Sequence, residues 1–396
     1  MMNVSREEIL DKIGESGIQE YGLCSGSLRE RIGEAAAKME KTKEPGVVVC
    51  ALNNADLDGI LLDLLKDEPE KVMDGIDIAA LALGAEKKTL HIPEYAQHLA
   101  DDAALAERLA QHQISLEVGI VDVRADAACL LLHLVTAVEL AEAFAQDAVG
   151  KACYYVSVNG KKLQRVEGSA RIADLADIGD AKVLRLGYAY YPAEAAQLTV
   201  EEAHIDNGVI AVLTSGECIV RDAQEQMTAA RKQSCGKCVF CREGLLQLQF
   251  MQKEIAEGRG KMDYLDLTEE IGSAMTFSGM CTLGQTAPKL ALSAVSAFRE
   301  EYEGHIRKKK CSAGACFSAE TYYIDPKLCT GCGDCMDVCP QDCIEGRAKY
   351  IHMIDTVDCG RCGKCMEACG DGAVVRTEGK LPKLPNRLTK VGKFRR

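Results

Sequence analysis

Two copies of one cysteine pattern, near the C-terminal end of the 396-residue chain, restrict its fold more than any other feature. The pattern is C-x2-C-x2-C-x3-C. It reads C-T-G-C-G-D-C-M-D-V-C-P from Cys329 to Pro340 and C-G-R-C-G-K-C-M-E-A-C from Cys359 to Cys369. Each copy supplies three thiolates on a tight loop and a fourth on the following turn. This spacing is typical of proteins that bind two [4Fe–4S] clusters, in which the fourth cysteine of each copy ligates the other cluster.

Crossed ligation divides these eight cysteines into two predicted ligand sets. The sets are Cys329, Cys332, Cys335 and Cys369 for the first cluster, and Cys359, Cys362, Cys365 and Cys339 for the second. Zinc knuckles are the alternative, because C-x2-C is also a zinc-binding spacing. The Cys-Pro ending and the repeated octet favour iron–sulfur clusters. Residues 323–380 are therefore expected to form a two-cluster ferredoxin domain that transfers electrons.

Composition indicates the compartment and the class of partner. The chain has 20 cysteines, which gather at metal-ligand spacings instead of scattering as in a disulfide framework, and the charged start Met1–Asp11 lacks the apolar core of a signal peptide. A reducing cytoplasm is therefore expected. No run reaches the roughly 18 apolar residues of a membrane span. The net charge of −13 argues against nucleic acid as the main partner.

The C-terminal tail, residues 381–396, has the opposite charge from the rest of the chain. From Lys380 to Arg396 there are seven Lys or Arg and no acidic residue. Such a run is either a solvated, disordered tail or a segment that docks onto an acidic partner.

Strands alternating with helices predict an α/β domain with a largely parallel sheet over residues 1–148. A capping box at Ser5 begins a short helix. The other predicted elements are a buried strand at Gly46–Leu52, a helix at Glu68–Leu83, a strand at Thr89–Ile92, an alanine-rich helix at Glu94–Gln111 and a strand at Leu116–Val123.

The pattern changes near residue 150. Tyr154–Val158 and Lys161–Val166 flank Asn159-Gly160 and predict a hairpin. A short helix near Arg171–Ala176 and an alternating strand at Lys182–Tyr188 follow. Residues 149–200 therefore resemble a small β-grasp module, and residues 201–308 are expected to be mostly helical.

A third cysteine loop lies within this helical region. Cys235, Cys238 and Cys241 repeat C-x2-C-x2-C, and Cys281 is the nearest downstream cysteine that could complete the ligand set. The prediction is a third [4Fe–4S] cluster, with zinc again as the alternative. Lys237 and Arg242 flank the loop, and cations there would stabilise a reduced cluster and raise its potential.

The residues around this loop resemble a known family. S-C-G-K-C-V-F-C-R-E-G at Ser234–Gly244 and C-T-L-G-Q-T-A-P at Cys281–Pro288 are similar to the C-terminal helical domain of the flavin- and NADH-binding subunit of respiratory complex I. NAD-linked formate dehydrogenases and electron-bifurcating hydrogenases have homologous subunits, and the hydrogenase branch also appends a two-cluster ferredoxin domain. Asp67–Ala85 resembles the family helix G-D-P-H-x-V-I-E-G-x-x-I-A-A-x-A-I-G-A. The β-module falls where the family has its β-grasp domain.

The resemblance also implies a flavin site that this chain has lost. In the family, S-G-L-R-G-R-G-G-A-G-F-P-T-G holds the FMN phosphate and NADH, whereas the matching stretch Ser16–Gly26 keeps one inner glycine, Gly22. Gln19 and Tyr21 replace the arginines, and Glu20 adds a carboxylate that repels phosphate. A long loop after Cys129 is also missing. FMN and NADH binding is therefore expected to be absent. The contrary interpretation is that Asn54, Asp56 and a rebuilt loop hold a flavin in another pose.

Further metal-ligand residue types lie in and beside the linker at residues 309–322. His305, Cys311 and Cys316 are candidate zinc ligands, with Cys343 as the fourth, and similar linkers occur in the hydrogenase-type relatives. Free thiols and a solvated histidine are the alternative. Five other cysteines lack partners at ligand spacing and are interpreted as core residues: Cys24, Cys50, Cys129, Cys153 and Cys218.

The resulting hypothesis is an electron-transfer subunit of a soluble, multi-subunit oxidoreductase of anaerobes. Three [4Fe–4S] clusters would relay electrons between partner redox centres, without FMN. The resemblance implies as partners a flavin- or metal-containing catalytic subunit, a thioredoxin-like [2Fe–2S] subunit, and ferredoxin. Two alternatives remain open: an active FMN-containing NADH:acceptor subunit, and a structural or redox-sensing iron–sulfur protein.

Overall fold

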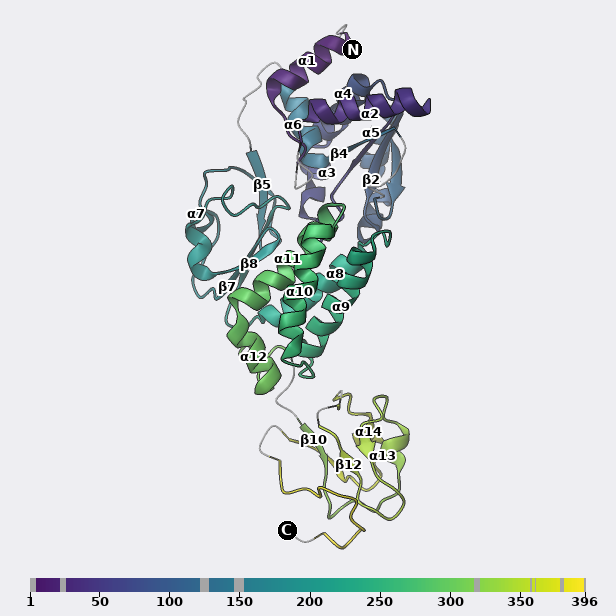
Figure 1. Cartoon of the computed structure of the whole chain (residues 1–396), viewed down its shortest axis with the longest axis vertical. Coiled ribbons are helices and arrows are strands. Elements are labelled where there is room, and N and C mark those ends of the chain that lie inside the picture. Colours follow the sequence, from purple (N-terminus) through teal and green to yellow (C-terminus); the bar gives the residue numbers. More distant parts are fainter. Residues whose placement is uncertain are drawn as a thin grey trace. The chain divides into compact units, whose positions relative to one another are not determined.

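The computed structural model in Figure 1 describes residues 5–21, 26–121, 128–145, 153–316, 321–356, 358–359, 361–377 and 381–394. The chain separates into two compact units. Unit 1 comprises Met1–Thr214, Glu225–Gln249 and Leu267–Ala297, and unit 2 comprises Ser215–Gln224, Phe250–Asp266 and Phe298–Arg396. Among the described residues, every helix is too short or too polar to cross a bilayer.

A four-stranded sheet forms the N-terminal part of unit 1. Its order is β3-β2-β1-β4 and each of its strand pairs is parallel, as the alternation of strands and helices predicts. The strands are β1 (Val47–Ala51), β2 (Lys87–Ile92), β3 (Ser115–Val118) and β4 (Cys129–His133). Val48 and Cys50 of the inner strand β1 have no exposed surface, which confirms the interpretation of Cys50 as a core residue.

Helices pack around this sheet. They are α1 (Arg6–Ser16), α2 (Leu28–Thr42), α3 (Leu64–Asp67), α4 (Pro69–Leu83), α5 (Ala103–Gln111) and α6 (Leu134–Phe144), with 3₁₀ helices η1 (Ile60–Asp63) and η2 (Glu94–Asp101). The predicted capping box is present: the Ser5 hydroxyl accepts from the Glu8 N–H, and the Glu8 carboxylate accepts from the Ser5 N–H. The prediction of one helix over Glu94–Gln111 is wrong. Asp102 is extended and caps α5 by accepting from the Ala104 N–H at 2.9 Å, so η2 and α5 are separate.

The close packing of α4 against α6 depends on Gly75 (Figure 1). A Cβ atom at this position would lie 1.9 Å from the Ala137 carbonyl oxygen. We expect Gly75→Ala to lower the free energy of unfolding of unit 1 by about 3 kcal/mol, because overpacking here meets backbone and not a movable side chain. Gly33→Ala in α2 is the matched control: its Cβ would meet no atom within 4 Å, and Ala favours helix by about 0.5–1 kcal/mol. Urea denaturation followed by circular dichroism compares the two, and an equal stability of both variants would contradict the packing account.

A second, five-stranded sheet follows in unit 1 with the order β6-β5-β9-β7-β8. Its strands are β5 (Cys153–Val158), β6 (Gln164–Glu167), β7 (Val183–Leu186), β8 (Ala189–Pro192) and β9 (Val209–Leu213), with α7 (Ile172–Leu175) and η3 (Ala193–Gln197) between them. β5 and β6 form the predicted antiparallel hairpin. Asn159 and Gly160 both have positive φ at its turn, as an Asn-Gly turn requires.

Five helices make up the next part of the chain. They are α8 (Ile219–Lys232), α9 (Val239–Ala256), α10 (Asp263–Ser278), α11 (Thr282–Ala297) and α12 (Arg299–Arg307). Within unit 1, α11 lies against β8 (Figure 1), where the Ser293 hydroxyl accepts from the Tyr190 N–H at 2.9 Å.

The C-terminal part of unit 2 contains the double cysteine pattern. Its elements are β10 (Thr321–Ile324), α13 (Asp334–Asp337), β11 (Ile344–Glu345), β12 (Met353–Ile354), α14 (Lys364–Ala368) and β13 (Val374–Thr377). β10 pairs with β13 and β11 with β12, both antiparallel. The tail is ordered over its described residues: the Thr389 carbonyl accepts from the Ile351 N–H at 2.9 Å, and Phe394 packs against the core.

Candidate iron–sulfur and metal sites

The double cysteine pattern of unit 2 forms two cavities. The first is lined by the four sulfur-bearing residues of the first predicted set, namely Cys329, Cys332, Cys335 and Cys369. Ile324 and Val374 add apolar walls. Burial, with the neighbouring sulfurs, raises the pKa of Cys335 to about 11. A site of four thiols with few competing polar groups fits a [4Fe–4S] cluster, whose binding displaces the thiol protons.

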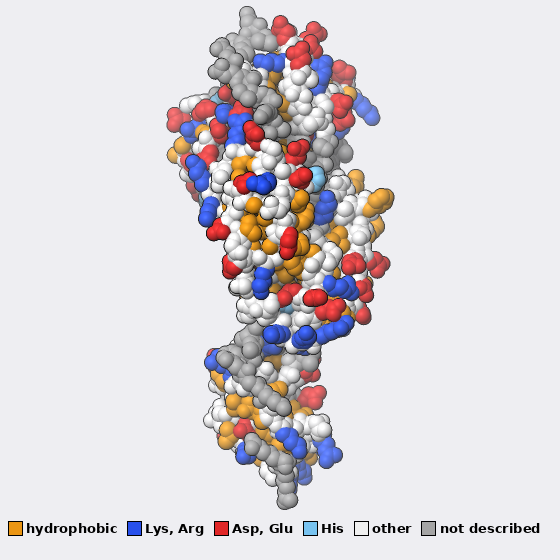
Figure 2. Space-filling view, turned by 90° about the vertical axis from the view of Figure 1, so that its left-hand side faces the viewer, with side chains coloured by type: hydrophobic (Ala, Val, Ile, Leu, Met, Phe, Trp, Pro, Cys, Tyr) orange, Lys and Arg blue, Asp and Glu red, His pale blue; other side chains and the backbone are white. Residues whose placement is uncertain are grey.

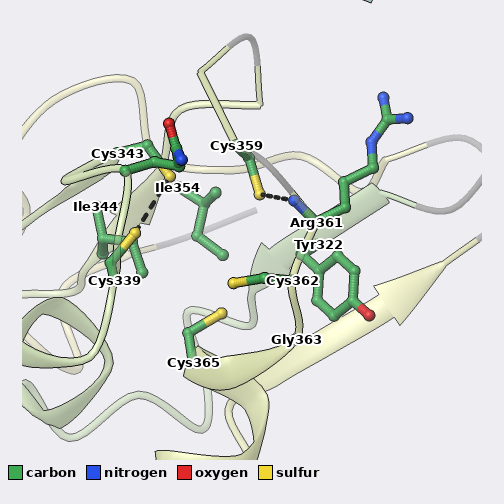
Figure 3. A pocket seen from close by; sticks show the side chains of 11 residues that line it. Tyr322, Cys339, Cys343, Ile344, Ile354, Cys359, Arg361, Cys362, Gly363 and Cys365 are labelled. Carbon is green, nitrogen blue, oxygen red and sulfur yellow. Dashed lines mark hydrogen bonds between the residues drawn. The ribbon is translucent and has the colours of Figure 1, made fainter. Parts of the chain in front are cut away.

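The second cavity is lined by the residues of the other predicted set, Cys359, Cys362, Cys365 and Cys339. Figure 3 shows the sulfur atoms of this set turned toward one another, between Ile344, Ile354 and Tyr322. The Cys359 sulfur accepts a hydrogen bond from the Arg361 N–H at 3.4 Å. The crossed grouping expected from the spacing is therefore the grouping in which the chain brings these cysteines together.

The third predicted set lies in unit 1, at the starts of two helices. Cys238 directly precedes α9, Cys241 lies in its first turn, and Cys281 directly precedes α11. The Cys281 sulfur accepts from the backbone N–H groups of Gly284 and Leu283. Helix N-termini stabilise thiolates, so both helices favour the iron-binding form.

Interactions among these four cysteines indicate that they share one site. Burial raises the pKa of Cys241 and of Cys281. The charges of Cys281, Cys238 and Cys235 add to the shift of Cys241, and those of Cys235 and Cys238 add to the shift of Cys281. Arg242 donates to the Gly236 carbonyl at 3.0 Å and also pairs with Glu243 at 2.8 Å. Its guanidinium therefore holds the cysteine loop, while Glu243 offsets part of its charge.

A separate cluster of metal-ligand atoms lies in unit 2. It consists of Cys218, His305, Cys311 and Cys316, whose ligand atoms all lie within 4.8 Å of one another. His305 is fully buried, and its Nε2 lies 3.3 Å from the Cys218 sulfur. The Cys316 and Cys218 sulfurs are 3.2 Å apart. Three thiols and one imidazole are a ligand set that structural zinc sites use.

Neighbouring groups prepare this cluster to bind a cation. The His305 Nδ1 lies 2.8 Å from the Glu301 carbonyl and donates to it, which leaves Nε2 facing the sulfurs. The hydrogen bond from Cys316 lowers the pKa of Cys218 to about 4. Burial opposes protonation of His305, but the hydrogen bond and charge interaction with Cys218, together with the interactions with Glu301 and Cys311, outweigh burial and raise the imidazole pKa to about 9. Binding of Zn²⁺ would displace the protons that form the hydrogen bonds among Cys218, Cys316 and His305. The exposed basic run Arg307–Lys310 lies between two of the ligands, and Figure 2 shows Lys and Arg side chains gathered where α12 ends.

The predicted fourth zinc ligand needs correction. Cys343 is not part of this cluster; it lines the second iron–sulfur cavity, with its sulfur 3.5 Å from that of Cys339. Cys218, interpreted from the sequence as a core residue, completes the group instead. It directly precedes α8 and lies 87 positions before His305, so spacing along the chain does not reveal it. The one sequence feature that could have indicated Cys218 as a ligand is its position directly before a predicted helix.

The stretch compared with the family's flavin loop is described up to Tyr21 and again from Gly26, so Gly22 and Cys24 lie outside the described residues. Glu20 is buried, and its carboxylate accepts from the His133 N–H at 2.6 Å, at the start of α6. Burial raises the pKa of Glu20, while Arg31 and His133 oppose the rise. A helix N-terminus attracts phosphate groups, and here a carboxylate of the chain itself occupies one.

The side chains of Asn54 and Asp56 also have internal partners. Asn54 exchanges two hydrogen bonds with the Val121 backbone, at 2.8 and 3.2 Å. Asp56 accepts from the Tyr188 hydroxyl at 2.8 Å and from the His133 Nε2 at 3.1 Å. The His133 Nδ1 accepts from the Val135 N–H, which leaves the Nε2 as the donor. Asn54 and Asp56 therefore have hydrogen-bond partners within the chain, and the carboxylates of Glu20 and Asp56 do not fit an FMN phosphate.

Comparisons with known proteins agree with the iron–sulfur geometry. Residues 222–305 match the family model "NADH-ubiquinone oxidoreductase-F iron-sulfur binding region", and residues 322–345 match "4Fe-4S binding domain". The NADP-reducing hydrogenase subunit HndC of Solidesulfovibrio fructosivorans is 38% identical over 146 residues, or 37% of this chain and 30% of that protein. The F subunit of NADH-quinone oxidoreductase from Streptomyces coelicolor is 36% identical over 94 residues, or 24% of this chain and 21% of that protein.

A solved structure is similar over a longer stretch. A chain of an NAD+-reducing [NiFe]-hydrogenase in the H2-reduced state has a TM-score of 0.63 at 18% identity, covering 76% of this chain and 63% of its own. At this identity the likeness shows an α/β fold in common. The matched stretches span less than a third of HndC and of the NADH-quinone oxidoreductase protein. Over its iron–sulfur region, residues 222–305 and 322–345, this chain is therefore similar to HndC and to the F subunit of NADH-quinone oxidoreductase.

Proposed function

We propose that the chain is an electron-transfer subunit of a larger oxidoreductase and relays electrons through three [4Fe–4S] clusters. The observation that carries this proposal is that each of two cavities is lined by four predicted cluster ligands of the double motif. Charge interactions among Cys235, Cys238, Cys241 and Cys281 support a third group. The names of its relatives, a hydrogenase subunit and NADH-quinone oxidoreductase subunits, support an NADH- or NADP-linked complex. The thiol-rich sites support a reducing compartment, the cytoplasm.

The proposed domain organisation follows the chain. A flavin-subunit-like α/β scaffold occupies residues 1–148. The β-grasp module begins at 149 and extends past the boundary at 200 expected from the sequence, because β9 (Val209–Leu213) belongs to its sheet. A helical [4Fe–4S] domain follows up to 308, and a two-cluster ferredoxin domain occupies 323–380. Cys311 and Cys316 of the linker 309–322, together with Cys218 and His305, would hold one structural zinc. Because the Zn²⁺ would be bound by three thiolates and a neutral imidazole, the site would carry a net negative charge, which the neighbouring basic run Arg307–Lys310 offsets.

The scaffold is proposed to lack FMN and NADH. Two features support this: the Glu20 carboxylate occupies the start of α6, and the Asp56 carboxylate already accepts hydrogen bonds from Tyr188, His133 and the Asn53 N–H. Introducing a phosphate beside a buried carboxylate would cost about 4 kcal/mol for two charges about 4 Å apart at a half-buried site. Electrons would then enter from a redox centre on a partner subunit.

A partner is proposed to dock at the third cluster. Four large apolar side chains next to its cysteines are exposed, namely Val239 (61%), Phe240 (57%), Phe277 (94%) and Met280 (68%). Exposed apolar residues gathered in this way mark protein interaction sites. The basic side chains of the ordered tail, including Lys383 and Arg387, are a second candidate surface, suited to an acidic redox protein.

Metal and flavin analysis of the purified full-length chain tests the proposal. We expect twelve iron atoms and twelve acid-labile sulfides per chain, one zinc, and no flavin fluorescence after acid release. Stoichiometric FMN would instead favour an active NADH:acceptor subunit. Eight iron atoms together with two zinc atoms would assign one of the cysteine groups to zinc and remove the three-cluster relay.

A further inference from the structure

The two halves of the ferredoxin part can be compared position by position, because their cysteine motifs are 30 residues apart. The comparison pairs Cys339 with Cys369 and Cys343 with Ala373. Cys343 lines the second cavity and Ala373 lines the first. One cavity thus carries a fifth thiol at a position where the other carries a methyl group.

The backbone hydrogen bonds to the two paired ligands, Cys339 and Cys369, are alike. The two sites therefore differ in the Cys343 thiol, which the first cavity lacks. The Ala373 N–H donates to the Cys369 sulfur at 3.2 Å. The Cys343 N–H likewise donates to the Cys339 sulfur. In the second cavity alone, a side chain adds to this bond: the Cys343 and Cys339 sulfurs lie 3.5 Å apart, as the dashed line in Figure 3 shows.

Ligand chemistry determines which of the two sulfurs donates. Cys339 is predicted to bind iron as a thiolate, which has no proton to give. Cys343 must therefore be the donor. It is 6% exposed and lies beside Ile344, in surroundings that exclude water and keep the thiol in place.

We infer that Cys343 tunes the second cluster by donating an S–H hydrogen bond to the sulfur of its ligand Cys339. A reduced cluster carries one more negative charge than an oxidised one, so a donor aimed at its sulfur stabilises the reduced state and raises the reduction potential. The inference depends on the ligand sets of the proposed function. Ala373 offers no such donor to the first cluster. A described side-chain contact to a sulfur of that set, from the His352 Nδ1 to the Cys329 sulfur, is longer, at 3.9 Å. The effect of Cys343 is therefore measured by comparing the potential of the second cluster in a variant with the potential of the same cluster in the unsubstituted chain.

A redox titration of the full-length chain, followed by electron paramagnetic resonance, tests this role. For Cys343→Ala we expect about a tenfold fall in the ratio of reduced to oxidised second cluster at a fixed potential, which is about 59 mV for one electron. The potentials of the other clusters should not move, and iron analysis should match the unsubstituted chain. Cys343→Ser retains a donor of similar size and should stay within about twofold of the original ratio.

Three results would overturn the inference. The potential of the second cluster could be the same in Cys343→Ala as in the unsubstituted chain. The Ser and Ala variants could shift equally, which would assign the effect to volume and not to the hydrogen bond. Cys343→Ala could also lose four iron atoms, which would make Cys343 a ligand. Zinc in place of iron in the unsubstituted ferredoxin part would instead contradict the proposed function itself, so the two failures are distinguishable.

Discussion

Cys238→Ala is expected to lower the iron content from twelve to eight atoms per chain and to stop electron transfer through the helical domain. Cys238 is partly exposed and lies just outside α9, so its loss removes a ligand without opening the core. Loss of an outer-shell partner lowers metal affinity or activity by about 10–100-fold, and loss of a direct ligand should exceed this. Rates of partner-dependent electron transfer should therefore fall by more than about 100-fold.

The matched control is Cys50→Ala, in the inner strand β1. Cys50 is fully buried and lies outside each of the proposed ligand sets, so this variant should keep twelve iron atoms and lose only stability, by roughly 1–2 kcal/mol for one small buried group. Iron analysis and the rate of dye or ferredoxin reduction by the intact assembly compare the two variants. Unchanged transfer in Cys238→Ala, with four iron atoms gone, would remove the third cluster from the relay.

Cys218→Ala is expected to abolish zinc binding and to destabilise unit 2. The substitution leaves Cys311, Cys316 and the fully buried His305 without one of four ligands, and binding of structural zinc contributes about 10–16 kcal/mol in small zinc-finger peptides. Even a fraction of that free energy would be a large part of the stability of a domain. Zinc analysis should give none per chain, and the thermal unfolding midpoint should fall by more than about 10 °C.

Cys343→Ala is the control that separates the two candidate fourth ligands. Because the Cys343 sulfur lies beside Cys339 in the iron–sulfur cavity, this variant should retain its zinc. Retention of zinc by Cys218→Ala, together with its loss from Cys343→Ala, would restore the ligand predicted from the spacing. Loss from neither would show that the buried cluster of thiols and imidazole does not bind zinc.

Sequence patterns correctly predict the features of the fold that are determined by residues close together in the chain. The loops at Cys329 and Cys359 and the Asn159-Gly160 hairpin follow from spacing or turn chemistry over a few residues, and the structure contains them as expected. The parallel sheet of unit 1 follows from the order of strands and helices.

Contacts between distant parts of the chain are harder to predict. Cys218 reaches His305 only because α8 begins where α12 ends, a tertiary relation that no periodicity encodes. The alanine-rich stretch at Glu94–Gln111 has helical composition, but the Asp102 carboxylate accepts from two backbone N–H groups and starts a new helix. The sequence around Glu20 suggests only repulsion of a phosphate, whereas folding gives its carboxylate a buried partner in the His133 N–H. Local sequence preferences do not specify hydrogen-bond partners that are distant in the chain.

Rapid-freeze electron paramagnetic resonance on the assembled complex tests the relay most directly. The complex would be mixed with its reductant, frozen at intervals shorter than one turnover, and examined for the signals of all three clusters. The relay account predicts that each cluster is reduced at least as fast as the complex turns over, and that Cys238→Ala loses the third signal and slows the onset of reduction in the ferredoxin part. Clusters that remain oxidised through many turnovers, or that are reduced far more slowly than product forms, would contradict it.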